Sequence, residues 1–374
     1  MGKTERDVYI CATYYHILIA AIKGLRAEEK PDIVICDLLT DDNNCEAVAN
    51  NIRCSQIFRN VTVFPELKIR LFLGKGRIPN ICWGTARHGQ PLDGWEPLEN
   101  LPIKHLLADH ILIKKAIKEF QLNEYAFQNY RNVYAFADQL FASVYLRYTK
   151  TAYHIIEDGL DHYKNVFKYC TFSYNKTLRE KILSPLLEVH YIHGKSKYTK
   201  SVEVNDAEGI VPIPPPKVHV QPKAALFSAL HSDEKQKLLR LFTDGYDFSV
   251  PESLNCILLL TSPFVEDGLL ATQEQQIQLF REVLNTTCGG GQTVILKPHP
   301  RDFDGDIYRE AFAGQNVIVM EKNIPVEVLL FLEGVHFAKS VTVLSTALAQ
   351  LDFVEEKISL GFDWLNAWKE RNGA

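Results

Sequence analysis

The stretch that decides the fold is Thr293–Asp302, which reads TVILKPHPRD. Its β-branched first half predicts a buried strand of a parallel sheet. Pro298 and Pro300 cannot donate to a strand ladder, so the strand must end there. Ligands of open α/β sheets bind at the carboxyl ends of the strands. Lys297 and His299 therefore place a cation and an imidazole where an anion such as a phosphate would bind. The alternative is a proline-capped strand whose histidine only makes local hydrogen bonds.

Strand-like and helix-like segments alternate along the chain on both sides of this stretch. The pattern predicts strands at residues 8–11, 32–37, 61–64, 133–137, 153–156, 256–260, 293–296, 316–320 and 335–338. It predicts helices at residues 14–25, 45–52, 105–120, 139–148, 272–284 and 325–332, and another that starts at residue 345. Residues 65–99 are predicted to be irregular. The alternation is typical of an α/β protein with parallel, doubly wound sheets.

The domain organisation follows from the length and from one proline-rich segment. A chain of 374 residues is too long for one ordinary core, so two domains are expected. Residues 210–223 contain five prolines and predict a stiff linker between a domain at 1–209 and a domain at 224–374. Two α/β lobes joined in this way imply a cleft between them that would bind a ligand.

Composition excludes several classes of protein. The net charge of −5 gives no basic field of the kind that nucleic-acid-binding proteins show. The eight cysteines form no CxxC pair, so no zinc site is indicated. The sequence has no dinucleotide-binding GxGxxG and no P-loop. Its nearest match to a metal-clamping DxD is Asp304-Gly305-Asp306, which is expected to lie in a polar turn, so neither a cofactor nor a metal is expected. It also has no signal peptide and no apolar run of about 18 residues, which favours a cytoplasmic protein.

Two acidic turns of the same composition follow predicted strands: Glu157-Asp158-Gly159 and Glu266-Asp267-Gly268. A carboxylate at the end of a strand can take a proton from an attacking hydroxyl group. The alternative is a plain strand-ending turn, because Asp-Gly is a common turn pair. Two such turns at two strand ends make the catalytic interpretation stronger than one alone.

Hydroxyl, acidic and imidazole groups at other element ends are further candidates. Ser345 and Thr346 follow an apolar run and predict a helix N-terminus, which is also an anion site. Together with the KPHP residues they could hold one phosphate. Glu327 is expected either to bind the hydroxyls of a ribose or simply to start a helix. Thr13 and His16 follow the first strand, where His16 either contacts a sugar or phosphate or is a polar surface residue.

The order of these motifs resembles the bacterial sialyltransferases of glycosyltransferase family 52, which act on lipooligosaccharide and capsule. The resemblance rests on the acidic turn of the first lobe, then KPHP, then Pro325-Val326-Glu327, then Ser345-Thr346. The opening ICATYYHILIA, Ile10–Ala20, is also similar to the start of that family. The resemblance spans about residues 7–355.

The resemblance implies a GT-B fold with two Rossmann-like lobes and CMP-sialic acid as donor. It also implies inverting, metal-independent transfer to a terminal sugar, with galactose the expected acceptor. His299 would contact the departing CMP phosphate as general acid, while Ser345 and Thr346 would hold that phosphate and Glu327 the ribose. Asp158 is the preferred base, and Asp267 is kept as the alternative.

Three other functions are kept open. One is a glycerophosphotransferase that uses CDP-glycerol, another is transfer of a different sugar from its nucleotide, and the third is a non-catalytic nucleotide-sugar-binding protein. The expected partners are a nucleotide sugar and a glycan acceptor, without nucleic acid. A homodimer and a peripheral contact with the inner face of a membrane are also left open.

Overall fold

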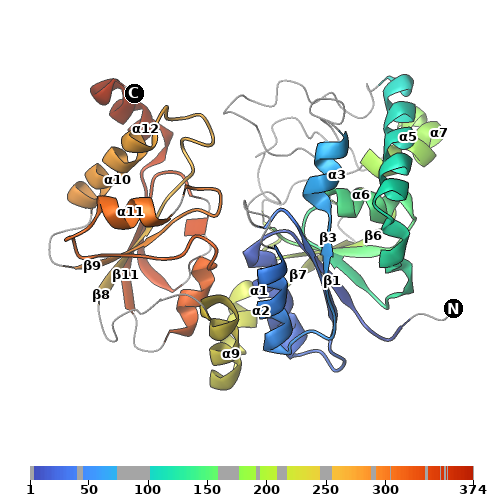
Figure 1. Ribbon diagram of the computed structural model, residues 1–374, viewed down its shortest axis with the longest axis horizontal. Coiled ribbons are helices and arrows are strands. Elements are labelled where there is room, and N and C mark those ends of the chain that lie inside the picture. Colours follow the sequence, from blue (N-terminus) through green and yellow to red (C-terminus); the bar gives the residue numbers. More distant parts are fainter. Residues whose placement is uncertain are drawn as a thin grey trace. The chain divides into compact units, whose positions relative to one another are not determined.

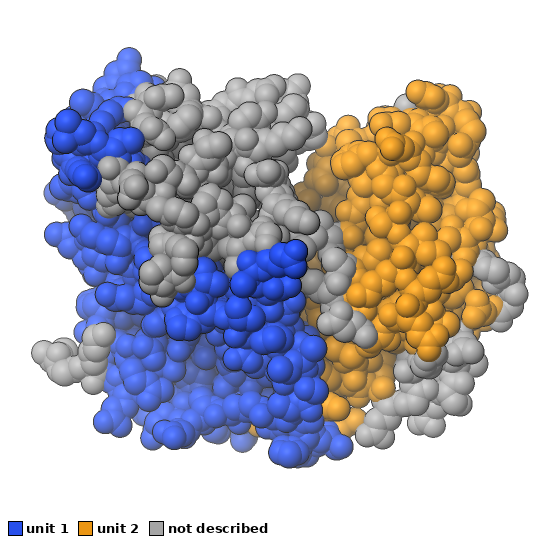
Figure 2. Space-filling view, turned by 180° about the vertical axis from the view of Figure 1, so that it is seen from behind, with its two compact units in different colours: residues 1–85, 92–234 blue, residues 86–91, 235–374 orange. Residues whose placement is uncertain are grey.

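The protein divides into two compact units, residues 1–85 with 92–234 and residues 86–91 with 235–374 (Figure 2). The computed structural model describes residues 4–39, 45–73, 102–158, 177–190, 194–208, 217–244, 255–287, 292–303, 305–332, 336–345, 347–348, 351 and 353–373. Each unit is built on its own parallel sheet (Figure 1). The prediction of an α/β chain with parallel sheets is therefore confirmed.

The sheet of unit 1 has the strand order β3-β2-β1-β4-β5-β6-β7, and all neighbouring strands are parallel. The strands are β1 (Val8–Cys11), β2 (Asp32–Cys36), β3 (Val61–Phe64), β4 (Val133–Ala135), β5 (Tyr153–Ile156), β6 (Thr199–Val204) and β7 (Val218–Val220). The chain builds the sheet outward first on one side of β1 and then on the other. The order therefore reverses between β1 and β4, and such a reversal opens a crevice at the carboxyl ends of the two strands.

Helices cover both faces of this sheet (Figure 1). They are α1 (Tyr14–Leu25), α2 (Cys45–Ser55), α3 (Glu66–Leu73), α5 (Ile103–Glu119), α6 (Phe141–Tyr148), α7 (Leu178–Leu187) and α8 (Lys223–Ser228), with 3-10 turns η1 (Leu122–Tyr125), η2 (Phe127–Asn129) and η4 (Glu188–His190). Ile69, Ile113 and Phe141 from α3, α5 and α6 pack in one core with Val8 and Ile10 of β1. Across the described residues, no helix is long and apolar enough to cross a membrane.

The sheet of unit 2 has the order β10-β9-β8-β11-β12, again with parallel neighbours, and reverses between β8 and β11. The division between the units falls within α9 (Ser232–Thr243). The other elements of unit 2 are β8 (Asn255–Leu260), α10 (Gln273–Thr287), β9 (Thr293–Lys297), α11 (Gly305–Ala311), β10 (Val317–Val319), the 3-10 helix η6 (Val326–Phe331), β11 (His336–Thr342), β12 (Val354–Ser359) and α12 (Gly361–Asn372).

One face of the unit 2 sheet packs against three helices. Leu279, Tyr308 and Trp368 from α10, α11 and α12 share a core with Leu259 and Leu296 of the central strands. Each large apolar side chain buried in this way contributes about 1.5–3 kcal/mol, whereas an exposed ion pair contributes about 0–1 kcal/mol. The sheets are therefore held mainly by their apolar cores, and the carboxyl edges can carry polar side chains.

The structure differs from the sequence predictions in several places. The predicted helix at 325–332 is the 3-10 helix η6, and the strands β6, β7 and β12 were not predicted. Helix α3 lies inside the segment 65–99 that was predicted to be irregular, and residues 74–99 of it lie outside the described part. The predicted linker 210–223 contains β7, which pairs with β6 at the edge of the unit 1 sheet, and the units divide after Glu234. Prolines predict extended backbone, and an edge strand is also extended, so composition alone does not separate the two.

Candidate active site

The carboxyl edge of the unit 1 sheet carries the first group of predicted site residues. β1 and β4 are neighbours there because Ile10 pairs with Ala135, and β5 lies on the other side of β4. Thr13 and His16 follow β1, and Asp158 comes two residues after β5. Residues from three adjacent strands thus meet at the point where the strand order reverses. We call Thr13, His16, Phe136 and Asp158 the Asp158 group.

His16 lies at the centre of the Asp158 group. It is in the first turn of α1, where its backbone N–H donates to the N-cap hydroxyl of Thr13 at 3.2 Å. Its ring is buried and stacks on Phe136, with the centroids 4.3 Å apart. His16 Nε2 lies 2.6 Å from Asp158 Oδ1, and the Ala12 N–H donates to His16 Nδ1 at 3.0 Å. A backbone N–H can only donate, so Nδ1 carries no proton and Nε2–H donates to the carboxylate.

Glu157 has different surroundings from its neighbour Asp158. It is buried, and its Oε2 accepts the backbone N–H of Asn205 at 2.6 Å. Its Oε1 lies 2.8 Å from Lys223 Nζ, and that ammonium also lies over the ring of Tyr15, 4.9 Å from the centroid. Glu157 therefore ties β5 to the segments around Asn205 and Lys223, while Asp158 faces His16.

The carboxyl edge of the unit 2 sheet carries the second group. The last residues of β9, β8 and β11 lie side by side at the same edge of the sheet, because Lys297 pairs with Leu260 and Leu260 pairs with Thr342. The KPHP segment continues β9, and Ser345 follows β11, where its N–H donates to Thr342 Oγ1 at 3.0 Å. His299 and Ser345 thus leave the same edge of the sheet, with the end of β8 between them.

Two backbone hydrogen bonds hold His299. Its N–H donates to Thr261 Oγ1 at 2.9 Å, and its Nδ1 accepts the N–H of Arg301 at 3.1 Å. The proton of the neutral ring is therefore on Nε2. Burial lowers the pKa of His299 to about 3, and the charges of Arg301 and Lys297 act in the same direction. The ring is thus a neutral Nε2–H donor at neutral pH.

A buried network that sequence reasoning missed supports the His299 turn. Thr261 Oγ1 donates to Asp302 Oδ2 at 2.5 Å, and Asp302 also accepts from Gln276 Nε2 at 2.7 Å and from the Tyr308 hydroxyl at 2.9 Å. Burial raises the pKa of Asp302 to about 6, although these hydrogen bonds oppose the rise. The Asp302 N–H in turn donates to the carbonyl of His299 at 2.9 Å. Thr261 directly follows β8 and Asp302 comes two residues after the KPHP segment, but nothing in the sequence pairs them.

Replacing Thr261 with valine tests this network. The change removes the hydroxyl that accepts the His299 N–H and donates to Asp302. Both buried groups then lack this hydrogen-bond partner, which lowers the free energy of unfolding by about 1–3 kcal/mol. Thr261→Ser keeps the hydroxyl and should cost much less. Urea denaturation of both variants measures the difference. Equal losses in the two variants would mean that the hydroxyl does not support the turn.

The Lys297 side chain forms hydrogen bonds to the backbone at the same edge of the sheet. It is buried, and its Nζ donates to the carbonyl of Pro298 at 2.5 Å and to the carbonyl of Lys322 at 2.9 Å. Burial lowers the pKa of Lys297 to about 7, while nearby carboxylates, Glu327 first among them, favour the charged form. Glu327 is itself buried in η6. Lys297 thus joins the KPHP turn to the segment that precedes Glu327.

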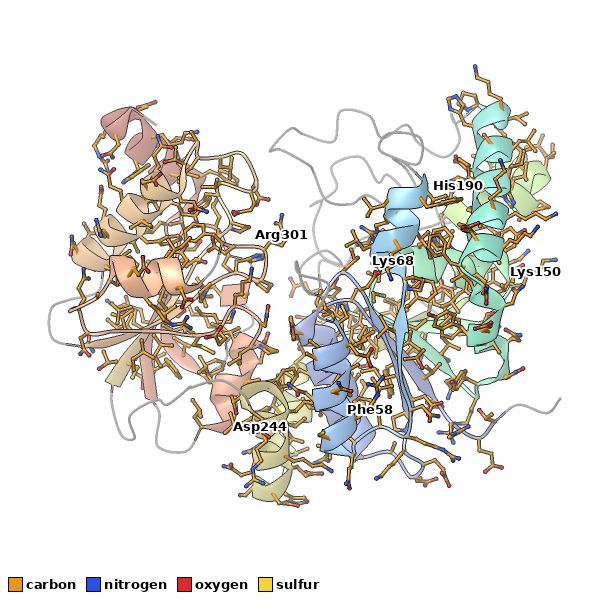
Figure 3. All side chains as sticks on the ribbon, in the orientation of Figure 1. Phe58, Lys68, Lys150, His190, Asp244 and Arg301 are labelled. Atoms are coloured by element: carbon orange, nitrogen blue, oxygen red, sulfur yellow. The ribbon has the colours of Figure 1, made fainter. Side chains whose placement is uncertain are left out.

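The second acidic turn has a structural explanation of its own. Arg301 and Asp267 form a two-pronged ion pair, with Nη1–Oδ1 at 2.8 Å and Nη2–Oδ2 at 3.4 Å. Figure 3 shows the Arg301 side chain projecting outward from the turn after β9. Gly268 has a φ of 70°, in the left-handed region that favours glycine, and Glu266 is exposed. Both oxygens of Asp267 are thus engaged by a cation that stands two residues after His299.

The remaining predicted residues are only partly described. Of the helix predicted to start at Ser345, residues 347–348 are described and have 3-10 geometry. The Ala347 N–H donates to Ser345 Oγ at 3.4 Å. Thr346 and Gly159 lie outside the described residues. Within the described ranges, no group of three or more His, Cys, Asp or Glu side chains is arranged to hold a metal ion.

Several solved structures are similar to this chain at low sequence identity. The GT-B domain of a sialyltransferase from Photobacterium damselae is 13% identical with a TM-score of 0.47, covering 94% of this chain and 90% of that one. UDP-GlcNAc 2-epimerase from Neisseria meningitidis bound to UDP-GlcNAc is 11% identical with a TM-score of 0.39, covering 90% and 77%. The spinosyn rhamnosyltransferase SpnG is 11% identical with a TM-score of 0.43, covering 98% and 83%. A comparison with curated proteins finds no match.

The comparison with protein families is decisive. The model of glycosyltransferase family 52 matches residues 105–361, which is more than half of the chain. The matched span includes Asp158, the KPHP segment, Glu327 and Ser345. The resemblance predicted from the order of the motifs is therefore confirmed. The chain belongs to glycosyltransferase family 52 and is a glycosyltransferase.

Proposed function

We propose that the chain transfers sialic acid from CMP-sialic acid to a terminal sugar hydroxyl of a surface glycan, with galactose as the acceptor sugar. Transfer inverts the anomeric carbon and needs no metal ion. Family membership and the order of the motifs support this proposal. The observation that carries it is the state of His299, whose Nδ1 accepts the Arg301 N–H so that an Nε2–H can donate to a leaving phosphate.

The proposed role of the unit 2 edge is to stabilise the leaving group. The bond between the anomeric carbon and the phosphate oxygen breaks, and its electron pair leaves with CMP. Donors already aimed at the developing charge lower the barrier, since they need not reorganise during the reaction. His299 Nε2–H is one such donor, Ser345 and Thr346 hold the same phosphate, and Glu327 accepts from the ribose hydroxyls.

The proposed role of the unit 1 edge is to activate the acceptor. As the acceptor oxygen bonds to the anomeric carbon, its proton passes to the carboxylate of Asp158. We prefer Asp158 to Asp267 because of their partners. Both oxygens of Asp267 are engaged by the Arg301 cation, whereas a hydrogen bond from His16 Nε2–H reaches one oxygen of Asp158.

The test is an incubation with CMP-sialic acid and a galactose-terminated oligosaccharide, in buffer with and without EDTA. We expect CMP and a sialylated product in equal amounts, with a product linkage of inverted configuration by NMR and unchanged rates in EDTA. Parallel reactions contain CDP-glycerol or other nucleotide sugars. Turnover of one of these in place of CMP-sialic acid would contradict the proposed donor, and binding of nucleotide sugars without any turnover would indicate a binding protein.

A further inference from the structure

The large apolar side chains that remain exposed are concentrated on two helices of unit 1. Isolated exposed apolar residues are common on protein surfaces, whereas a group of them marks a surface that meets a partner. Five of the nine such side chains in the described residues lie on α5 and α7 and are between 48% and 76% exposed: Ile103, Leu107, Ile111, Leu178 and Ile182.

Helix α5 carries three of these side chains on a single stripe. Ile103, Leu107 and Ile111 recur every four residues, so they lie on one face of the helix. Lys114 and Lys118 continue the same stripe through the last turns of the helix. The opposite face packs in the core of unit 1. The outward stripe is thus apolar in the first half of the helix and cationic in the second half.

Helix α7 adds a second apolar pair on the neighbouring helix. The two helices lie side by side and pack together around Leu106 of α5 and Leu187 of α7 (Figure 1). Leu178 and Ile182 are about one turn apart on α7, and each is more exposed than any apolar side chain of the α5 stripe. Apolar side chains of both helices therefore point away from the leucines that join them.

The charge on the two helices, all of whose residues the structure describes, is almost entirely positive. Glu119 is the one exposed acidic residue, because Asp109 and Glu180 are buried. The whole chain has a net charge of −5, so the excess of positive charge is local. The five exposed lysines are Lys104, Lys114, Lys115, Lys118 and Lys181. We call these lysines and the five exposed apolar side chains the α5–α7 surface.

We propose that the α5–α7 surface docks on an anionic lipid bilayer. The apolar side chains enter the boundary between headgroups and acyl chains, and the lysine ammonium groups reach the lipid phosphates. A second copy of this chain fits the surface less well. A symmetric contact through the same helices would bring ten lysines together with only Glu119 of each copy to pair with them.

Co-sedimentation of the full chain with lipid vesicles tests the proposal. The protein should sediment with vesicles of equal parts phosphatidylcholine and phosphatidylglycerol, and far less with phosphatidylcholine alone. Binding should weaken as the salt concentration rises, because salt screens the attraction between charges. No substrate is present, so the result does not depend on the proposed reaction. Absence of binding to the anionic vesicles at low salt would overturn the proposal.

Two double variants separate the charged part of the surface from the apolar part. Lys114→Gln with Lys118→Gln should lower the partition coefficient onto anionic vesicles by about fivefold for each lysine. Leu107→Ser with Ile111→Ser should lower it by about tenfold for each side chain, because each apolar contact with the bilayer is lost. All four side chains are exposed, so thermal melts should stay close to the wild type.

The matched control is Lys30→Gln with Lys200→Gln, which changes two exposed lysines elsewhere in unit 1 by the same charge. It should bind anionic vesicles almost as the wild type does. A loss in this control equal to that of Lys114→Gln with Lys118→Gln would overturn the assignment to α5 and α7. Light scattering adds one more outcome. A dimer that the exposed serine substitutions dissociate would assign the surface to a second copy and overturn the lipid proposal.

Discussion

Asp158→Asn is expected to lower kcat for sialyl transfer by about 10²- to 10⁴-fold, which is the usual contribution of a general base. The amide has the size of the carboxylate, and its oxygen can still accept from His16 Nε2, so the local geometry should survive. It cannot take the proton of the acceptor hydroxyl. KM for CMP-sialic acid should change little, because the proposed donor-binding residues belong to unit 2. Steady-state kinetics with both substrates varied measure these constants.

Asp267→Asn is made in parallel, because Asp267 is the alternative base. This change breaks the ion pair with Arg301, an exposed pair that contributes little to stability. If Asp267→Asn loses about 10²- to 10⁴-fold in kcat while Asp158→Asn stays active, the base is Asp267 of unit 2. Thermal melts of both variants separate a loss of chemistry from a loss of folding.

His299→Ala should lower kcat by about 10²- to 10³-fold, the typical cost of removing one preorganised donor from a transition state. His299→Gln keeps an N–H near the position of Nε2 and should retain more activity than His299→Ala. The comparison is informative because a neutral donor can be replaced by an amide, whereas an acid that must release a proton cannot. Equal losses in the two variants would favour the general acid that the family resemblance implies.

The pH dependence of His299 gives a second measurement of the same role. The pKa of its ring is about 3, below the value of about 6.5 for an unperturbed histidine. The folded protein therefore keeps the ring neutral between pH 5 and 8, and stability linked to this group falls as the pH drops below about 6.5. NMR of the ¹⁵N-histidine-labelled free protein should show the Nε2–H tautomer throughout this range. Titration of His299 near pH 6.5 would contradict this.

Much of the fold could be read from short-range patterns. The apolar run at residues 8–11 gave β1 with the same bounds, and the run at 293–296 gave β9 without its last residue. Strand ends then placed His16 and Asp158 on one edge, and His299 and Ser345 on another. These predictions succeed because a buried parallel strand and the residue that ends it lie within a few positions of each other.

The contacts within the two edges could not be predicted in this way. His16 and Asp158 are 142 positions apart, and Thr261 and Asp302 are 41 apart. Such pairs depend on which strands become neighbours, and one sequence has no periodic signal for that. The interpretation of Lys297 shows the same difficulty. A lysine at a strand end suggests an anion site. In the structure, however, Lys297 Nζ donates hydrogen bonds to the carbonyl groups of Pro298 and Lys322.

Both histidines of the two edges are bound at Nδ1 by a main-chain amide, His16 by Ala12 and His299 by Arg301. Because an amide hydrogen cannot face a second hydrogen, a proton added at His299 Nδ1 would break the hydrogen bond from the Arg301 N–H. Burial, which lowers the pKa of His299, acts in the same direction, so that this ring stays a neutral hydrogen-bond donor. If the Asp158 carboxylate is the only group that takes up a proton in the proposed reaction, the solvent deuterium isotope effect on the chemical step should vary linearly with the deuterium fraction of the water.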